Sequence, residues 1–204
     1  MKERQWAFLS DYVRLQALWL EGGVYLDADV EILKPLDIFL DNAFHIGYMH
    51  NCALGTAVMA SPAQHRLLGS LIRQYQRLPA DQAINNNAIL TEFFLRQVDG
   101  FRLSGRAWSS GDVSVHPKTW FEQPTLSKVG GFGVHLFNRA WDPNAACALR
   151  KGVARTTFLF VVRRRIRCFY EELRCVYFPF FLRDRFFLRF AMRLKRRKWL
   201  CNSA

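Results

Sequence analysis

The sequence predicts an α/β domain with a mixed sheet flanked by helices, followed by a basic helical tail at the C-terminus. Three observations support this fold class. Helix-like and strand-like segments alternate over residues 1–150, which is typical of α/β domains. Half of the 204 residues are apolar, enough to form a buried core. Residues 151–204 are instead rich in arginine and aromatic side chains, so we expect a domain over residues 1–150 and a basic aromatic tail over residues 151–204.

A helix and a strand are predicted at the start of the chain. Ser10 is a suitable N-cap for the helix, and Gly22 and Gly23 are expected to end it. Apolar and polar residues then alternate over residues 24–32, which predicts a single strand with one face in the core. The polar residues of that strand share the other face: Tyr25, Asp27, Asp29 and Glu31.

Shorter elements follow, with their boundaries read from apolar runs and from residues that break them. Strands are expected over residues 44–49, 54–60, 113–116 and 134–137, and helices over residues 62–77 and 81–97. The run Asn85-Asn86-Asn87 fits an asparagine-rich helix start and fits equally well a role in lining an acceptor cleft.

The net charge of +12 belongs to the tail. Residues 1–149 hold 13 Lys+Arg and 14 Asp+Glu, whereas residues 150–204 hold 16 and 3. Four arginines share one face of a helical wheel: Arg185, Arg189, Arg193 and Arg196. Because apolar side chains cover much of the remainder, an anionic membrane surface is the expected partner of residues 181–200. A packed helix with a solvated arginine face is the alternative, and no nucleic acid is expected because no RNA- or DNA-binding module accompanies the charge.

The spacing of Asp27 and Asp29 has a chemical reading of its own. On one face of a strand, their alpha carbons would lie about 6.5–7 Å apart. Two like charges so close are unfavourable unless a cation or hydrogen-bond donors compensate them. A divalent ion held by a carboxylate and by substrate phosphates would do so, and it would stabilise a diphosphate as a leaving group. The spacing alone is weak evidence, since it also arises by chance.

Two blocks of sequence carry a resemblance to a known family. They read Ser10-Asp11-Tyr12-Val13-Arg14 and Tyr25-Leu26-Asp27-Ala28-Asp29. This S-D-x-x-R … Y-x-D-x-D arrangement resembles the sugar-binding region of glycosyltransferase family 32 and is similar to that of the clostridial glucosylating toxins. Looser matches, extending the resemblance over about residues 6–142, are Lys34-Pro35-Leu36-Asp37, Val115-His116-Pro117, Phe121, Pro124, His135 and Trp141. The resemblance implies a GT-A type fold, with a Rossmann-like mixed sheet flanked by helices.

The resemblance implies a metal-dependent hexosyltransferase. Such enzymes move a hexose or N-acetylhexosamine from a nucleotide diphosphate sugar donor to a glycan or lipid-linked acceptor, with retention of configuration. The implied cofactor is Mn²⁺ or Mg²⁺. Asp29 would be the direct metal ligand, Asp27 would lie near the metal, and His135 would approach from the far side. A lone histidine, however, is more often a hydrogen-bonded structural residue.

The resemblance also implies which residues hold the donor. Asp11 and Arg14 would hold the sugar, Tyr25 would lie along the ribose, and Asp27 would contact the ribose or the sugar. Trp141 is placed beside the substrate. The implied catalytic residues, which orient the sugar and take up charge on the departing diphosphate, are Arg14, Asp27 and Asp29. The structural alternatives are an exposed helix pair for Asp11 and Arg14, a strand aromatic for Tyr25 and core packing for Trp141.

Two departures from the family pattern support a second hypothesis. Ala140 stands where the family usually has Ser before the Trp, and nine residues precede Ser10 where the family usually has some tens. The alternative function is therefore a catalytically inactive, N-terminally truncated remnant that binds a membrane surface through its basic tail.

Cysteine usage and the lack of a leader bear on location. The five cysteines show no CxxC or Cys/His zinc pattern, so a reducing compartment is expected, with Cys52 as a small buried side chain. No signal peptide or membrane-length apolar run is recognised. These features favour a cytoplasmic, peripherally membrane-associated bacterial enzyme of polysaccharide synthesis, or the Golgi lumen if the chain is eukaryotic.

Overall fold

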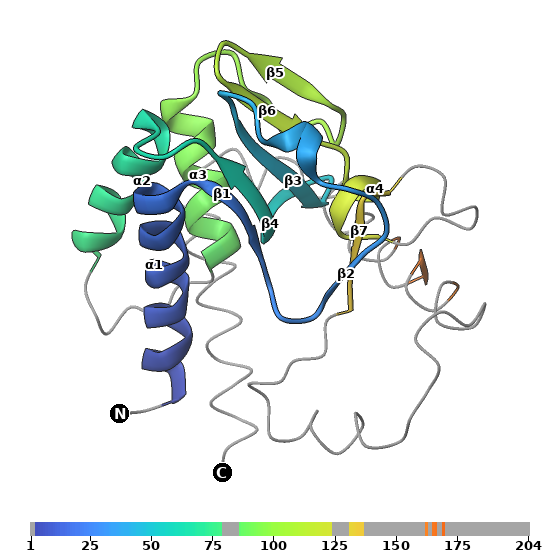
Figure 1. The fold of residues 1–204 in the computed structure, drawn as a ribbon, viewed down its shortest axis with the longest axis horizontal. Helices are drawn as coiled ribbons and strands as arrows, with labels where there is room; N and C mark the ends of the chain where they lie inside the picture. The colour runs from blue at the N-terminus through green and yellow to red at the C-terminus, as the bar shows by residue number, and fades with distance from the viewer. Residues whose placement is uncertain are drawn as a thin grey trace.

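A computed structural model of the protein describes residues 3–78, 86–123 and 131–136, together with 162, 165, 166 and 169. Within these residues, a five-stranded mixed sheet is flanked by helices, and a two-stranded sheet lies beside it (Figure 1). The predicted α/β class is confirmed, and the arrangement is consistent with a GT-A fold. The arginine-striped helix predicted over residues 181–200 of the tail lies outside the described residues.

The larger sheet has the strand order β1-β4-β3-β6-β5. Its strands are β1 (Gly23–Leu26), β3 (Phe44–His50), β4 (Ala53–Ser61), β5 (Trp108–Ser110) and β6 (Val113–His116). β3 and β6 pair in parallel, and the other neighbours are antiparallel. A parallel pair needs a long crossover connection. Here the connection from β3 to β6 includes β4, two helices and β5.

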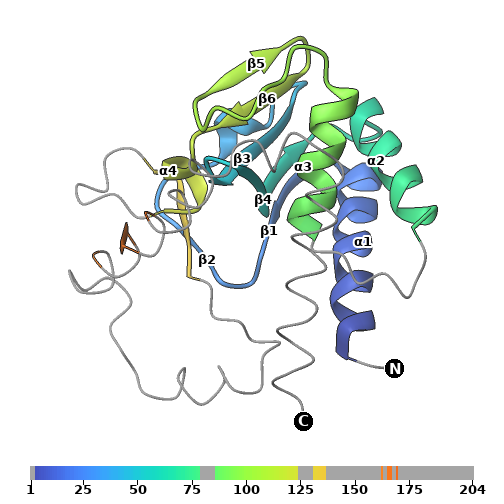
Figure 2. The same cartoon turned by 180° about the vertical axis from the view of Figure 1, so that it is seen from behind.

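Three helices pack on one side of this sheet, as both views show (Figures 1 and 2). They are α1 (Glu3–Glu21), α2 (Arg66–Gln76) and α3 (Asn86–Gln97). The main core lies between these helices and the sheet. It includes Leu15 and Leu18 of α1, Phe44 and Ile46 of β3, and Leu90 of α3, which are all at most 3% exposed.

The opposite side of the sheet carries a smaller layer. This layer contains β2 (Val30–Ile32), β7 (Gly133–His135), the 3-10 helix η1 (Asp37–Phe39) and the short helix α4 (Lys118–Phe121). Phe39 and Phe121 pack there against Val58 and Ala60 of β4. β2 and β7 pair antiparallel, with Val30 opposite His135. This pairing brings residues more than 100 positions apart to one end of the sheet.

The predicted single strand over residues 24–32 is wrong. The chain forms β1 against β4, turns at Asp27-Ala28-Asp29, and then forms β2 in the other sheet. The Asp27 amide donates to Ala57 O at 2.8 Å, whereas Asp29 O accepts from the Leu136 amide at 2.8 Å. The two aspartates therefore stand at a switch between sheets, and not on one face of a strand.

The predicted N-cap at Ser10 is also wrong, because α1 begins at Glu3 and passes through Ser10. Residues 3–9 contain no Gly or Pro, so nothing local stops the helix from starting earlier. The predicted end is confirmed: Gly22 and Gly23 adopt positive φ angles of 68° and 91°, which glycine tolerates, and the Gly22 amide donates to Leu18 O at 2.9 Å.

Most of the remaining elements agree with the sequence. The strands expected over residues 44–49, 54–60 and 113–116 are β3, β4 and β6, within one residue. α2 begins four residues later than expected, because Gln64 has a φ of 58° that a helix does not allow. The short elements β5, α4 and η1 are not predicted, since runs of three or four residues carry little periodicity.

Cys52 differs from its expected state. It is partly exposed and disulfide-bonded, so the expectation of a reduced, buried small side chain is wrong for this residue. Among the helices of the described residues, none combines the length and apolar character that a membrane span requires.

Two leucines of α1 test the position of the core. Leu15 is 0% exposed and Leu20 is 57% exposed. Leu15→Ala should lower the free energy of unfolding by about 2–5 kcal/mol because it opens a cavity. Leu20→Ala, the same truncation on the same helix, should change it by less than about 0.5 kcal/mol. Urea denaturation of both variants checks this, and equal losses would contradict the burial pattern of α1.

Candidate functional site

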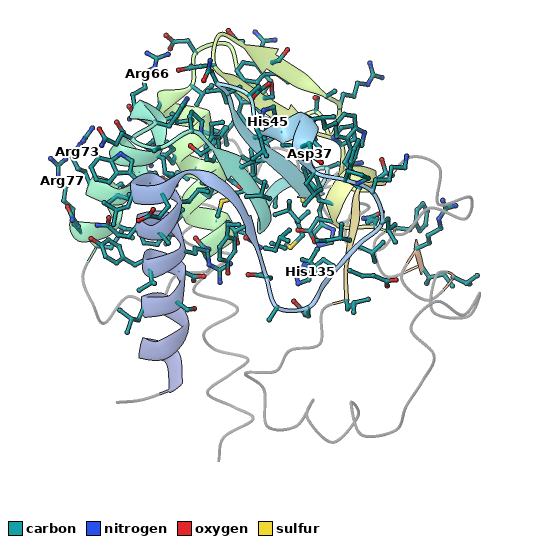
Figure 3. All side chains as sticks on the ribbon, in the orientation of Figure 1. Asp37, His45, Arg66, Arg73, Arg77 and His135 are labelled. Carbon is teal, nitrogen blue, oxygen red and sulfur yellow. The ribbon has the colours of Figure 1, made fainter. Side chains whose placement is uncertain are left out.

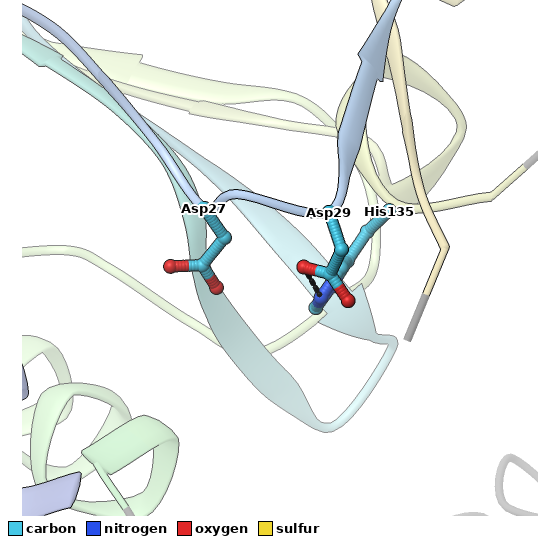
Figure 4. A group of neighbouring side chains, drawn as sticks. All are labelled: Asp27, Asp29 and His135. Atoms are coloured by element: carbon cyan, nitrogen blue, oxygen red, sulfur yellow. Dashed lines mark ion pairs between the residues drawn. The ribbon is translucent and has the colours of Figure 1, made fainter. Parts of the chain in front are cut away.

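The turn between β1 and β2 meets β7 in a cluster of two carboxylates and one imidazole. Asp27, Asp29 and His135 each offer one ligand atom, and these atoms all lie within 4.8 Å of one another. His135 Nε2 is 3.2 Å from Asp29 Oδ1, and the three side chains point the same way (Figure 4). Each side chain is partly buried. Carboxylate oxygens and an imidazole nitrogen suit a divalent cation such as Mn²⁺, so the donor set fits a metal site.

Arg14 of α1 connects two of the acids. Its Nη2 is 3.1 Å from Asp11 Oδ1, and its Nη1 donates to Asp27 Oδ1 at 2.8 Å. The guanidinium carbon lies 4.9 Å from the centre of the Tyr25 ring. The Arg14 side chain is only 12% exposed, so Arg14 and Asp11 are not the exposed surface pair that was the structural alternative.

Asp27 receives a second hydrogen bond from its own strand. The Tyr25 hydroxyl donates to Asp27 Oδ1 at 2.7 Å. Burial and the hydrogen bond to Asp27 raise the pKa of Tyr25, which keeps the phenol protonated as a donor. One oxygen of Asp27 is therefore fixed by Arg14 and Tyr25 on the side of α1, while the residue lies beside Asp29 and His135 on its other side.

Asp11 is a mostly buried acid with an altered titration. Burial raises its pKa to about 6, with the nearby charge of Asp27 acting in the same direction. The Arg14 charge and a hydrogen bond from Asn86 act against this rise. Asp11 therefore changes its charge within the physiological range.

The start of α3 joins this network through Asn86. Its Nδ2 donates to Asp11 Oδ1 at 3.0 Å and to Thr56 Oγ1 at 3.1 Å. The Tyr75 hydroxyl donates to Asn86 Oδ1. Asn86 thus begins α3, as one of the two sequence-based alternatives predicted. It also contacts Asp11, which the sequence did not predict. Thr56 and Tyr75 were missed, because neither stands in a recognisable motif.

Glu122 is a further residue that the sequence did not indicate. It is 2% exposed, and its Oε2 lies 2.9 Å from His135 Nδ1. Burial disfavours the charged form of His135, but the hydrogen bond to Glu122 and the charges of Glu122, Asp29 and Asp27 outweigh it, so that the pKa of His135 is raised. Glu122 follows Phe121 directly, and no signal in the sequence marks it.

One of the looser matches, His116, lies in the smaller layer, and another, Trp141, is outside the described residues. His116 contacts His45 at 2.9 Å between ring nitrogens and stacks on Trp120 at a centroid distance of 4.4 Å. Burial, followed by the charge of His45, lowers the pKa of His116 to about 4. His116 therefore packs within the smaller layer as a neutral ring.

A cavity of about 350 Å³ lies apart from the acids, between α2, α3 and the β5–β6 hairpin. Arg66, Trp108 and Asp112 are among its lining residues, and Asp27, Asp29 and His135 are not. Figure 3 shows Arg66 well separated from His135. We place the functional site at the acids because convergent ionisable groups indicate chemistry better than a hollow alone.

Comparison with known proteins agrees with this placement. Residues 1–45 match the family described as a glycosyltransferase sugar-binding region containing a DXD motif. The matched segment includes α1, the turn with Asp27 and Asp29, and β2. No curated protein and no solved structure matches the chain. The family-level resemblance read from the sequence is confirmed over residues 1–45, which match this family and contain Asp27-Ala28-Asp29.

Proposed function

We propose that this protein is a metal-dependent glycosyltransferase that takes a hexose or N-acetylhexosamine from a nucleotide diphosphate sugar. The observation that supports this most directly is the convergence of Asp27, Asp29 and His135 within 4.8 Å, inside a chain that carries a glycosyltransferase sugar-binding region. The acceptor we propose is a glycan or a lipid-linked glycan, and the transfer retains the anomeric configuration.

Asp29, Asp27 and His135 are the residues that would hold the cation, Mn²⁺ or Mg²⁺. When bound there, the cation supplies charge that neutralises the diphosphate leaving group. The donor atoms support this assignment, because hard oxygen ligands with one imidazole suit Mn²⁺ and tolerate Mg²⁺. Asp29 comes from the sheet switch and His135 from β7, so two separate segments hold the proposed site.

Asp11 and Arg14 are proposed to hold the donor sugar. Arg14 is fixed between Asp11 and Asp27 by contacts of 3.1 and 2.8 Å, so its guanidinium is oriented before substrate arrives. Asp11, when ionised, presents carboxylate oxygens that accept hydrogen bonds from sugar hydroxyls. Tyr25 packs beside Arg14 and orients Asp27, next to the ribose in our proposal.

The metal requirement is tested first with donor hydrolysis. A panel of nucleotide sugars is incubated with Mn²⁺ and the full chain, and sugar release is measured. Asp29→Ala should lower kcat/KM for the preferred donor by at least about 100-fold, because a direct ligand is lost. Glu31→Gln, which removes a negative charge two residues away, should change it by less than about twofold.

Chelation by EDTA should abolish the same activity, and added Mn²⁺ should restore it. Full activity in Asp29→Ala would contradict the proposed metal site. Failure of the unchanged chain to hydrolyse any donor, together with no Mn²⁺-dependent binding of a nucleoside diphosphate, would sink the enzyme proposal and favour an inactive remnant.

The titration of Asp11 predicts a pH dependence. The pKa of Asp11 is raised to about 6, so the charged form that accepts hydrogen bonds is lost as the pH falls through 6. Donor kcat/KM should therefore fall at least about tenfold from pH 7 to pH 5. Asp11→Asn should lower the value at pH 7 and make the fall shallower, while protonation of the ligand His135, whose pKa is also raised, still lowers activity in both chains. The exposed acid Asp99 gives the control, since Asp99→Asn should keep the full fall; an equally steep fall in Asp11→Asn would refute the role of Asp11.

The basic C-terminal segment is proposed to bind an anionic membrane surface. The support is compositional: residues 150–204 carry 16 Lys+Arg and 3 Asp+Glu. The chain should sediment with phosphatidylserine vesicles and release them in high salt, because each basic residue near the surface contributes about 1 kcal/mol. Replacing the four arginines of the wheel stripe by glutamine should weaken binding. Equal binding of the unchanged chain and this variant to phosphatidylserine vesicles, or equal binding of the unchanged chain to neutral and anionic vesicles, would contradict the proposal.

A further inference from the structure

Glu122 is a buried carboxylate whose position is fixed by its backbone. It directly follows α4, and its amide donates to Lys118 O at 3.0 Å. The neighbouring Phe132 amide donates to Trp120 O at 2.7 Å, which ties α4 to the segment that leads into β7. At 2% exposure, a carboxylate is costly unless it accepts hydrogen bonds or faces a positive group. Among the described residues, one group that it faces is the His135 ring, with Oε2 at 2.9 Å from Nδ1.

The space for this carboxylate exists because β4 has a glycine beside it. A Cβ placed on Gly55 would overlap Glu122 Oε1 and would lie 3.2 Å from Glu122 Cδ. It would also lie 3.1 Å from the Cβ of Met49. The carboxylate therefore lies against bare backbone on one side and against His135 on the other. The missing side chain of Gly55 therefore leaves the space that the buried Glu122 carboxylate occupies.

The two nitrogens of His135 face opposite partners. Nδ1 faces Glu122 Oε2 at 2.9 Å, and Nε2 faces Asp29 Oδ1 at 3.2 Å. Because the two ring nitrogens point in different directions, a carboxylate at Nδ1 does not share with Nε2 the position of a common cation. Glu122 is therefore placed to act through His135 rather than as another ligand.

We infer that Glu122 is a positioning residue of the metal site: it accepts the Nδ1–H of His135 and so holds the ring with the Nε2 lone pair toward Asp29 and Asp27. This inference rests on the proposed function, since it assumes that Asp29, Asp27 and His135 hold a divalent cation. A hydrogen bond from Nδ1 to a carboxylate fixes the tautomer of a ligating histidine and increases the basicity of its other nitrogen.

Mn²⁺ binding by the full chain is the first test, with free Mn²⁺ followed by electron paramagnetic resonance. Glu122→Ala should weaken Mn²⁺ affinity about 10–100-fold. Glu122→Gln should lower the affinity by a smaller factor, because the amide oxygen still accepts the Nδ1–H of His135. Some loss is still expected, because the amide carries no charge. Glu31→Gln, the charge control on β2, should change the affinity by less than about twofold. The inference would be overturned if Glu122→Gln, Glu31→Gln and Glu122→Ala all lowered Mn²⁺ affinity equally. Glu122 would then act only through its negative charge and not through its contact with His135.

Gly55→Ala keeps the carboxylate but displaces it. The added methyl group should push Glu122 away from His135 and lower Mn²⁺ affinity about tenfold, although no ionisable group is removed. Circular dichroism and thermal unfolding of each variant show whether it is still folded. A folded Gly55→Ala chain with unchanged Mn²⁺ affinity would count against the positioning role.

The tautomer of His135 gives a readout without any metal. Long-range ¹H–¹⁵N correlation spectra, taken above the pH at which the same spectra show His135 to lose its charge, should show the neutral ring protonated at Nδ1. Its signals are identified by their loss in His135→Gln. Glu122→Ala should shift the ring toward the Nε2–H form, which a purely structural role of Glu122 would not require. An Nε2–H ring in the unchanged chain would overturn the inference.

The two proposals fail in different ways. If the unchanged chain binds no Mn²⁺, or if Asp29→Ala binds it equally well, the proposed metal site fails and the inference falls with it. If Mn²⁺ binds through Asp29 but the Glu122 variants alter neither the affinity nor the tautomer, the positioning role alone fails and the proposed function stands.

Discussion

Repulsion among converging carboxylates is the constraint on which this site depends. Asp11, Asp27, Asp29 and Glu122 are all partly or fully buried, and within the described part of the chain Arg14 and, when protonated, His135 bring positive charge to them. Carboxylates this close together are unfavourable in a partly dry environment unless positive charge lies among them. A divalent cation bound by Asp27, Asp29 and His135 would add such charge, which is the role that the proposed metal dependence gives it.

The switch between two sheets determines how the acids of the site are held. A continuous strand would place Asp27 and Asp29 in a fixed relation along one ladder. The break instead leaves the Asp27 amide bonded to β4 and the Asp29 carbonyl bonded to the residue that follows β7. Each acid is thus held by a different sheet, and β7 carries His135 to the same point. Irregular backbone at this position is stable because its polar groups are paired on both sides.

What the sequence predicts well is local. Asp11, Arg14, Asp27 and Asp29 lie within 19 consecutive residues, and their spacing led to the family that residues 1–45 match. The break at Asp27 was not predictable, because apolar and polar residues go on alternating through the turn as they do in a strand. The sequence suggested Ser10 as the N-cap because serine is common there. It did not show that α1 begins at Glu3 and continues through Ser10.

The contacts that sequence reasoning missed are those made across the fold. Asn86 reaches Asp11 over 75 positions, and Glu122 reaches His135 from the end of a four-residue helix. Neither contact has a local pattern, since it depends on where α3 and α4 pack. Gly55 is a further example, because a glycine in a strand interior signals a close approach without naming its partner.

Asp27 joins the two halves of the site. On one side, Arg14, Tyr25 and, through Asp11, Asn86 form a hydrogen-bonded group suited to recognising sugar hydroxyls. On the other side, Asp29, His135 and Glu122 form an acidic group suited to a cation. Asp27 accepts two bonds from the first group through one oxygen and lies within ligand distance of the second. A change in either half therefore reaches the other through a single carboxylate, so that in the proposed function sugar recognition and the handling of the leaving group are coupled.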